Sequence, residues 1–223
     1  MFKKVIMLGI SALMLLGLGA CGNGEVISER DTSTGSSLDN EDVSASIIPD
    51  SESNNNEETD IDSDSSVLIA YFSWSGNTKQ LADVIQEQIG GELFEIEPET
   101  PYTDDINELS GIALQEQRNN ARPPLNSIVE DMSQYDVIFV GFPNWWNNMP
   151  MPVFTFLEEY DFSGKTVIPF TTYGNGGWGK SVDSIKETLP EATILDGLAI
   201  QEHELQGAPT EVSEWLQALG LTK

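Results

Sequence analysis

The chain has 223 residues, of which 37 are acidic and only 10 are basic, so its formal net charge at pH 7 is −27. This balance argues against nucleic acid as a partner, because phosphate backbones are bound through Lys and Arg side chains. The single cysteine, Cys21, excludes an intrachain disulfide, so a hydrophobic core must stabilise the fold.

Residues 1–20 are predicted to be a secretory signal peptide. Lys3 and Lys4 precede an apolar run that is too short and wrongly flanked for a membrane-spanning helix. Its end, Leu18-Gly19-Ala20-Cys21, resembles a bacterial lipobox. The resemblance implies cleavage before Cys21, a lipid on its sulfur, and a position on the extracytoplasmic face of the cell membrane. A plain secreted protein with a stray cysteine is the alternative.

Residues 21–65 differ in composition from the rest of the chain. From Gly22 to Ser65 there are 13 acidic residues, one basic residue and no aromatic residue. Such a segment cannot bury enough apolar surface to offset the entropy lost on ordering, and its like charges keep it extended. We predict an acidic, disordered tether.

Residues 66–223 have the length of one domain. Their hydrophobic pattern alternates between strand and helix, which favours a doubly wound α/β parallel sheet with ligand-binding loops at the carboxyl ends of the strands. The predicted strands are Val67–Phe72, Leu93–Glu97, Val137–Gly141, Thr166–Thr171 and Leu195–Ile200. The predicted helices are Thr78–Gln88, Ile106–Arg118, Val153–Glu159, Ser181–Leu189 and Thr210–Leu219.

The first strand is followed by a loop that is typical of a phosphate cradle. A helix that begins directly after a hydroxyl-rich turn directs its free N–H groups and its dipole at an anion. Ser73, Ser75 and Thr78 add hydroxyl donors, and no lysine lies within the loop. The alternative is an ordinary turn in which Asn77 or Ser75 caps the helix.

The loops after the third and fourth strands carry aromatic residues and glycines. Glycines let a backbone approach a ligand closely, and aromatic side chains on converging loops can form two walls around a flat heterocycle. The alternative is that these rings only cap the end of the sheet. The four rings are Trp145, Trp146, Tyr173 and Trp178.

Together these motifs resemble the flavodoxin-like family. Ser73-Trp74-Ser75-Gly76-Asn77-Thr78 is similar to the flavodoxin phosphate-binding turn, and residues 141–150 and 173–179 resemble the ring-binding loops of a bacterial lipoprotein subgroup. The resemblance implies a five-stranded sheet in the order 2-1-3-4-5, bound FMN and no metal. It assigns cofactor binding to Ser73, Trp74, Ser75, Gly76, Asn77, Thr78, Pro143, Asn144, Trp145, Trp146, Asn147, Thr172, Tyr173, Gly174, Gly176 and Gly177.

One motif points to a different cofactor. Residues 174–181, GNGGWGKS, fit the ATP/GTP P-loop pattern. The motif follows the fourth strand, however, which leaves little chain for a nucleotide fold, and no later apolar strand ends in an aspartate that would hold magnesium. We therefore interpret it as the fourth loop of the flavodoxin-like domain.

Two classes of function are compatible with this reading. The first is an FMN-dependent oxidoreductase or electron carrier that exchanges electrons with a quinone or a redox partner protein. The 24 acidic and 7 basic residues of the domain favour a basic partner surface. The second is a non-catalytic binding module. Arg118, Arg122 and His203 are expected to lie among carboxylates at the surface, and no catalytic residue is assigned.

Overall fold

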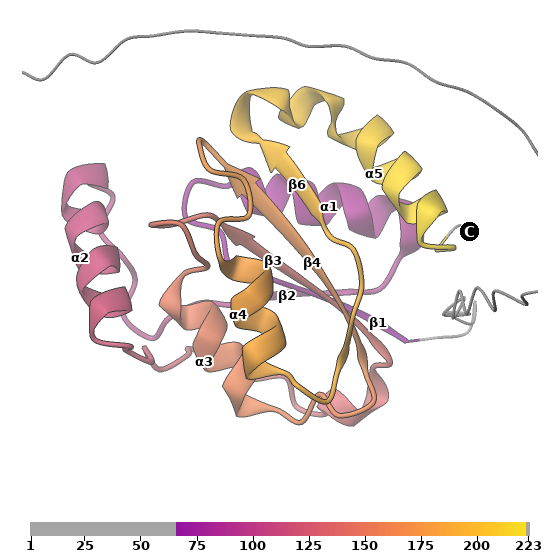
Figure 1. Cartoon of the computed structure of the whole chain (residues 1–223), viewed down its shortest axis with the longest axis horizontal. Coiled ribbons are helices and arrows are strands. Elements are labelled where there is room, and N and C mark those ends of the chain that lie inside the picture. The colour runs from indigo at the N-terminus through magenta and orange to yellow at the C-terminus, as the bar shows by residue number, and fades with distance from the viewer. Residues whose placement is uncertain (1–65, 222–223) are drawn as a thin grey trace, which may run out of the picture. The chain divides into compact units, whose positions relative to one another are not determined.

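The computed structural model describes residues 66–221, which form a parallel sheet flanked by helices (Figure 1). The strands are β1 (Val67–Tyr71), β2 (Glu92–Glu95), β3 (Val137–Pro143), β4 (Thr166–Tyr173), β5 (Thr193–Ile194) and β6 (Leu198–Gln201). The helices are α1 (Asn77–Ile89), α2 (Ile106–Arg118), α3 (Met151–Glu159), α4 (Ser181–Thr188) and α5 (Ala208–Ala218), with short 3-10 turns η1 (Met132–Gln134) and η2 (Glu202–Gly207). The predicted signal peptide and tether lie outside the described residues.

The strands pair in the order β2-β1-β3-β4-β5, and β6 also pairs with β4. All of these pairs are parallel. The predicted α/β class and the 2-1-3-4-5 order are therefore confirmed. In this order the carboxyl ends of β1, β3 and β4 are adjacent, so the three predicted ligand loops leave the sheet at one edge.

Two hydrophobic clusters cover the two faces of the sheet. Successive side chains of a strand point to opposite faces, so Leu68 and Ala70 join one cluster while Ile69 and Tyr71 join the other. Helices α3 and α4 cover the first face, and α1 and α5 cover the second (Figure 1). Burial on both faces explains why β1 and β3 read as continuous apolar runs. Together the two clusters give residues 66–221 a core on both faces of the sheet.

The sequence predicts one fifth strand, Leu195–Ile200, whereas the structure has two short strands, β5 before this segment and β6 over its second half. Val167 pairs with Ile194 but Phe170 pairs with Leu198, so the fifth strand carries one extra residue between these pairs. Pro169 lies in β4 opposite this bulge and has no N–H to donate. Gly197 lies in the bulge, so close to β4 that a Cβ at this position would clash with the Pro169 carbonyl oxygen.

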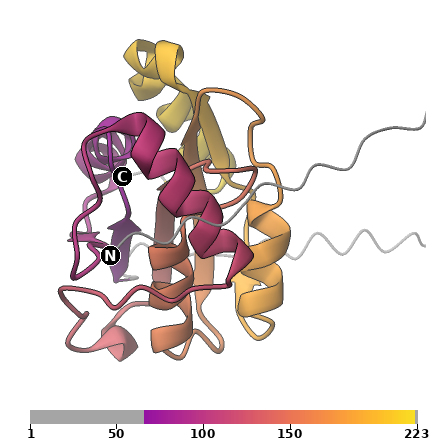
Figure 2. The same cartoon turned by 90° about the vertical axis from the view of Figure 1, so that its left-hand side faces the viewer.

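Helix α2 has the predicted bounds and lies at one side of the sheet (Figure 1), the side that faces the viewer in Figure 2. The Asp105 carboxylate caps it by accepting hydrogen bonds from the backbone N–H groups of Asn107 and Glu108. These two bonds lower the pKa of Asp105. Only Leu109 and Ala113 of α2 are buried. None of the helices within residues 66–221 has the length and apolarity needed to cross a bilayer.

We predict that Gly197→Ala destabilises the domain by about 1–3 kcal/mol, because a Cβ there would clash with the Pro169 carbonyl oxygen and lie 2.6 Å from the Trp178 ring. Gly111→Ala in α2 is the control, since its new Cβ meets nothing within 4 Å and alanine favours helix. Urea unfolding of both variants measures the difference. Equal stability of the two variants would contradict this account of the bulge.

Candidate functional site

The loop after β1 leads into α1 through Gly76, whose φ of 88° is left-handed. No side chain at the N-cap bonds the first turn of α1, and that turn carries no acidic residue. The first-turn N–H groups at Asn77 and Thr78 are therefore available to an outside acceptor. The Ser73 hydroxyl oxygen accepts the N–H of Lys79 at 3.2 Å and closes the loop over the helix start. The alternative prediction was an ordinary turn in which Asn77 or Ser75 caps the helix, and neither side chain forms such a cap.

Thr78 occupies a different place from the other loop residues. Its side chain is buried, and its Oγ1 lies 2.8 Å from Oγ1 of Thr172 in β4. The sequence predicted the Thr78 hydroxyl as a phosphate donor, whereas in the structure it links the first loop to β4. The exposed hydroxyl of this loop is that of Ser75.

The loop after β3 contains a tight two-residue turn. Trp145 N–H donates to the Asn148 carbonyl at 2.8 Å, and Asn148 N–H donates back to Trp145 at 3.1 Å. The two central residues, Trp146 and Asn147, have φ angles of 49° and 66°, as a type I′ turn requires. Asparagine adopts this conformation readily, but a tryptophan with positive φ is strained.

Direct hydrogen bonds join the loops after β3 and β4. The Asn144 amide nitrogen donates to the Gly177 carbonyl at 2.7 Å, and Lys180 N–H donates to the Asn147 carbonyl at 2.9 Å. Gly179 has a φ of 54°, and a Cβ there would clash with the Asn147 carbonyl oxygen. The Asn144 Oδ1 atom is buried and has no hydrogen-bond partner among the described residues. It is an unused acceptor at the junction of the two loops.

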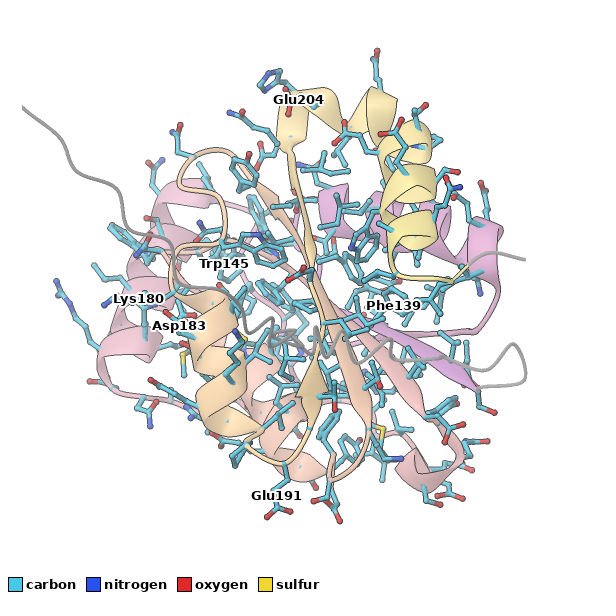
Figure 3. The ribbon with its side chains drawn as sticks, turned by 45° about the vertical axis from the view of Figure 1, so that its right-hand side comes forward. Phe139, Trp145, Lys180, Asp183, Glu191 and Glu204 are labelled. Carbon is cyan, nitrogen blue, oxygen red and sulfur yellow. The ribbon has the colours of Figure 1, made fainter. Side chains whose placement is uncertain are left out.

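The four loop aromatics have different environments. Trp146 is half exposed, and Tyr173 is partly buried. Trp178 packs edge-on against Phe142, with 6.3 Å between ring centroids, and against Gly197. It therefore belongs to the packing of the sheet end, as the alternative reading expected for an individual ring. Figure 3 shows Trp145 on the same side of the molecule as Lys180.

Trp145 belongs to an aromatic group that sequence analysis did not assemble. Its ring meets Phe72 edge-on at 5.2 Å and Tyr102 edge-on at 5.4 Å. The Tyr102 hydroxyl donates to Glu116 of α2 at 2.6 Å. Tyr102 lies 43 residues from Trp145, so no local pattern connects the two rings before the chain folds.

Two indole N–H groups connect the site loops to the α2 segment. Trp74 donates to the Thr103 carbonyl at 3.0 Å, and Trp146 donates to the Ser110 carbonyl at 2.9 Å. The Gln117 side chain returns a bond of 3.4 Å to the Trp146 carbonyl. Helix α2 is therefore attached to the first and third loops as well as to α3.

The structure places Arg118, Arg122 and His203 at the surface, where the sequence predicts them. Arg122 forms an ion pair with Glu158 at 2.6 Å, and the exposed His203 lies 3.9 Å from the Glu204 carboxylate. Arg118 is also exposed, at the end of α2.

The P-loop-like segment ends in Ser181, whose side chain is buried, so its hydroxyl cannot coordinate a magnesium ion in solvent as a P-loop serine does.

The flavodoxin family model matches residues 66–219, which include every strand and all three loops. The chain belongs to the flavodoxin family. The predicted family is therefore confirmed. Flavodoxin 1 of Escherichia coli K12 is 29% identical to this flavodoxin domain over 106 residues, which is 46% of either chain. The chain thus spans about half the length of the curated relatives it matches.

Two solved structures resemble the flavodoxin domain over almost their whole length. A candidate flavoprotein from Bacteroides eggerthii is 32% identical with a TM-score of 0.61, and the match covers 71% of this chain and 99% of that one. A flavoprotein from Lactobacillus acidophilus in complex with FMN is 27% identical with a TM-score of 0.56, and the match covers 68% of this chain and 98% of that one. Because those chains consist of little else, such a domain folds without further segments.

The partly buried Glu116 makes the stability of the flavodoxin domain depend on pH. Burial raises its pKa, and the hydrogen bond from Tyr102 only partly offsets the rise. The folded state therefore holds this proton more tightly than the unfolded chain, so the contribution of Glu116 to stability decreases as pH rises through the ordinary range of a carboxyl group and above it. Glu116→Gln removes this contribution and should gain stability relative to the parent as pH increases from 4 to 7.

Urea unfolding at several pH values checks this prediction. The exposed Glu87→Gln on α1 is the control for charge removal alone. A stability difference between Glu116→Gln and the parent that stays constant from pH 4 to 7 would contradict the predicted role of burial.

Proposed function

We propose that this protein is an FMN-binding electron carrier or oxidoreductase that acts on the outer face of the cell membrane. One observation carries the proposal: α1 has a glycine at its N-cap and no carboxylate in its first turn, which leaves the N–H groups of Asn77 and Thr78 open to an acceptor at the sheet edge where the three loops meet. A helix start of this kind favours an anion such as a phosphate monoester. The FMN complex of the related Lactobacillus acidophilus flavoprotein supports the cofactor assignment.

The residues present fit FMN. The N–H groups of Asn77 and Thr78 and the hydroxyl of Ser75 would hold the phosphate. The unpaired Asn144 Oδ1 offers an acceptor for a ring N–H once the adjoining loops admit it. Trp146 is the most exposed of the loop aromatics and Tyr173 is partly exposed, so both can contact a flat ring, and the Gly174–Gly177 backbone directly follows Tyr173.

When bound, FMN supplies one- or two-electron transfer, and the protein binds and orients it. Bonds from Asn144 to Gly177 and from Lys180 to Asn147 fix the two ring-side loops relative to each other. Fixed loops keep the cofactor position constant from one transfer to the next, which lowers the cost of ordering at each turnover. No residue of the chain is assigned as a proton donor or acceptor.

The partner is proposed to be a redox protein with a basic surface or a quinone. The domain has 24 acidic and 7 basic residues, and Lys79 and Arg122 are already paired with Asp83 and Glu158. A net negative surface accelerates encounters with basic proteins and repels anionic lipid headgroups. A lipid on Cys21 would hold the domain at the membrane in spite of that repulsion.

The cofactor proposal predicts a selective effect of Asn77→Asp. A carboxylate at the start of α1 would compete with the phosphate for the same N–H groups, so FMN affinity should fall at least about tenfold. Riboflavin, which lacks the phosphate, should bind the variant and the parent equally. Visible-absorbance titrations of both ligands measure the four affinities, and Asn77→Ser serves as the neutral control.

The carboxylate itself favours helix α1, so loss of folding would not explain weaker FMN binding. If the parent domain fails to change the flavin spectrum at all, the FMN proposal is wrong and the non-catalytic module becomes the better description. If riboflavin and FMN weaken together, the phosphate does not lie at α1.

The anchoring proposal predicts that Cys21→Ser releases the protein from the membrane. In cells fed a labelled fatty acid, the parent should carry the label and sediment with membranes, whereas the variant should be unlabelled. Because Cys21 is the only cysteine, no disulfide is lost in the variant. Labelling that persists in Cys21→Ser would overturn the proposed anchor.

A further inference from the structure

A small cleft lies between α2 and the turn that follows β3. It has a volume of about 190 Å³. One wall comes from Ile106, Ser110 and Ala113 of α2, and the other comes from Trp145 and Trp146. The cleft is therefore built largely from apolar and aromatic side chains that are brought together from positions more than 30 residues apart.

Exposed apolar side chains gather at this cleft. Three large hydrophobic side chains of the described residues are exposed, and two of them, Ile106 at 58% and Trp146 at 50%, line it. Exposed apolar side chains that gather in a concave site indicate binding more strongly than scattered ones do. The third, Ile128, does not line the cleft.

The Trp146 ring is held in place before any ligand arrives. Its indole N–H donates to the Ser110 carbonyl, and its backbone has the strained φ of 49°. A rigid aromatic wall loses little entropy on binding a second ring, and strain of this kind gathers at functional positions. The geometry thus favours a flat ligand that stacks on, or packs edge-on against, this tryptophan.

Two residues that line the cleft have polar side chains, Ser110 and Asn144, and the Asn144 amide nitrogen is already bonded to the Gly177 carbonyl. The Ser110 side chain lies in its wall, and its hydroxyl forms no hydrogen bond with another described residue. A hydroxyl is both a donor and an acceptor, so it can pair with a ring carbonyl or with a ring hydroxyl. An apolar cavity of about 150 Å³ holds benzene, so 190 Å³ suits one substituted six-membered ring and is small for the three fused rings of a flavin.

We propose that this cleft binds a single oxygenated ring of the quinone and hydroquinone class, with Ser110 bonded to the ring oxygen and Trp146 forming the aromatic wall. The inference rests on the proposed function, because Trp146 belongs also to the FMN site and would place the ring beside the cofactor. The non-protein redox partner would then bind on the α2 side of the FMN site.

The test uses the isolated domain, residues 66–223, and follows the tryptophan indole signals by ¹H–¹⁵N NMR. The probe is hydroquinone under anaerobic conditions, and p-xylene is the ring of similar shape without oxygen. Hydroquinone should shift the indole signals of Trp145 and Trp146 and leave those of Trp178 and Trp215 in place. It should do so with and without bound FMN.

Ser110→Ala tests the polar contact, since it keeps both the helix and the backbone carbonyl that holds Trp146. Hydroquinone affinity should fall about fivefold, as expected for one lost hydrogen bond, while p-xylene affinity stays unchanged. Ala113→Leu fills the cleft and should abolish binding of both rings. Gly111→Leu adds the same side chain to the same helix at a position where a Cβ meets nothing within 4 Å, and should leave binding intact.

Three results would overturn the inference: no shift at Trp145 or Trp146, an equal effect of Ser110→Ala on both probes, or displacement of hydroquinone by FMN from the same α2 signals. The last result would show that the cleft is part of the flavin site itself. Failure of the proposed function has a separate signature, which is an unchanged visible flavin spectrum when FMN is added to the domain.

Discussion

The burial of the parallel sheet on both faces is the constraint on which the rest of this structure depends. Leu68 and Ile69 point to opposite faces, and each is fully covered by a different helical layer. A sheet closed in this way leaves only its ends for polar chemistry. The three loops at the carboxyl ends of β1, β3 and β4 therefore become neighbours, and the free N–H groups of α1 are held beside them.

Hydrogen bonds join those loops to one another, in addition to the packing of Trp145 and Trp178. The Thr78–Thr172 hydroxyl pair ties the first loop to β4, and Asn144 ties the third loop to the fourth. Such bonds contribute little net stability, but a buried group left without its partner is costly. They therefore specify one arrangement of the loops. Two buried side-chain atoms of residues 66–221 lack a partner, Asn144 Oδ1 and the Ser181 hydroxyl, and the first lies at the junction of the third and fourth loops.

Helix α2 is joined to the site in a way that its amphipathic pattern does not suggest. Two indole N–H groups, from Trp74 and Trp146, donate to carbonyls of the segment that contains it. Each of these tryptophans lies in a loop assigned to the cofactor. The segment that contains α2 is thus held against the first and third loops by hydrogen bonds from their tryptophans.

The sequence predicted the alternation of strands and helices and the positions of the three loops, because buried strands and glycine-rich turns are local patterns. The family and the strand order followed from the resemblance of these loops to flavodoxins, which the sequence also carries. The sequence did not determine the division of the fifth strand, which depends on Pro169 in the neighbouring strand. Nor could it pair Tyr102 with Trp145 and Glu116, turn Trp178 toward Phe142, or bring Ser110 to Trp146. These contacts join residues 14 to 43 positions apart whose spacing carries no periodic signal, so only the packed tertiary structure decides them.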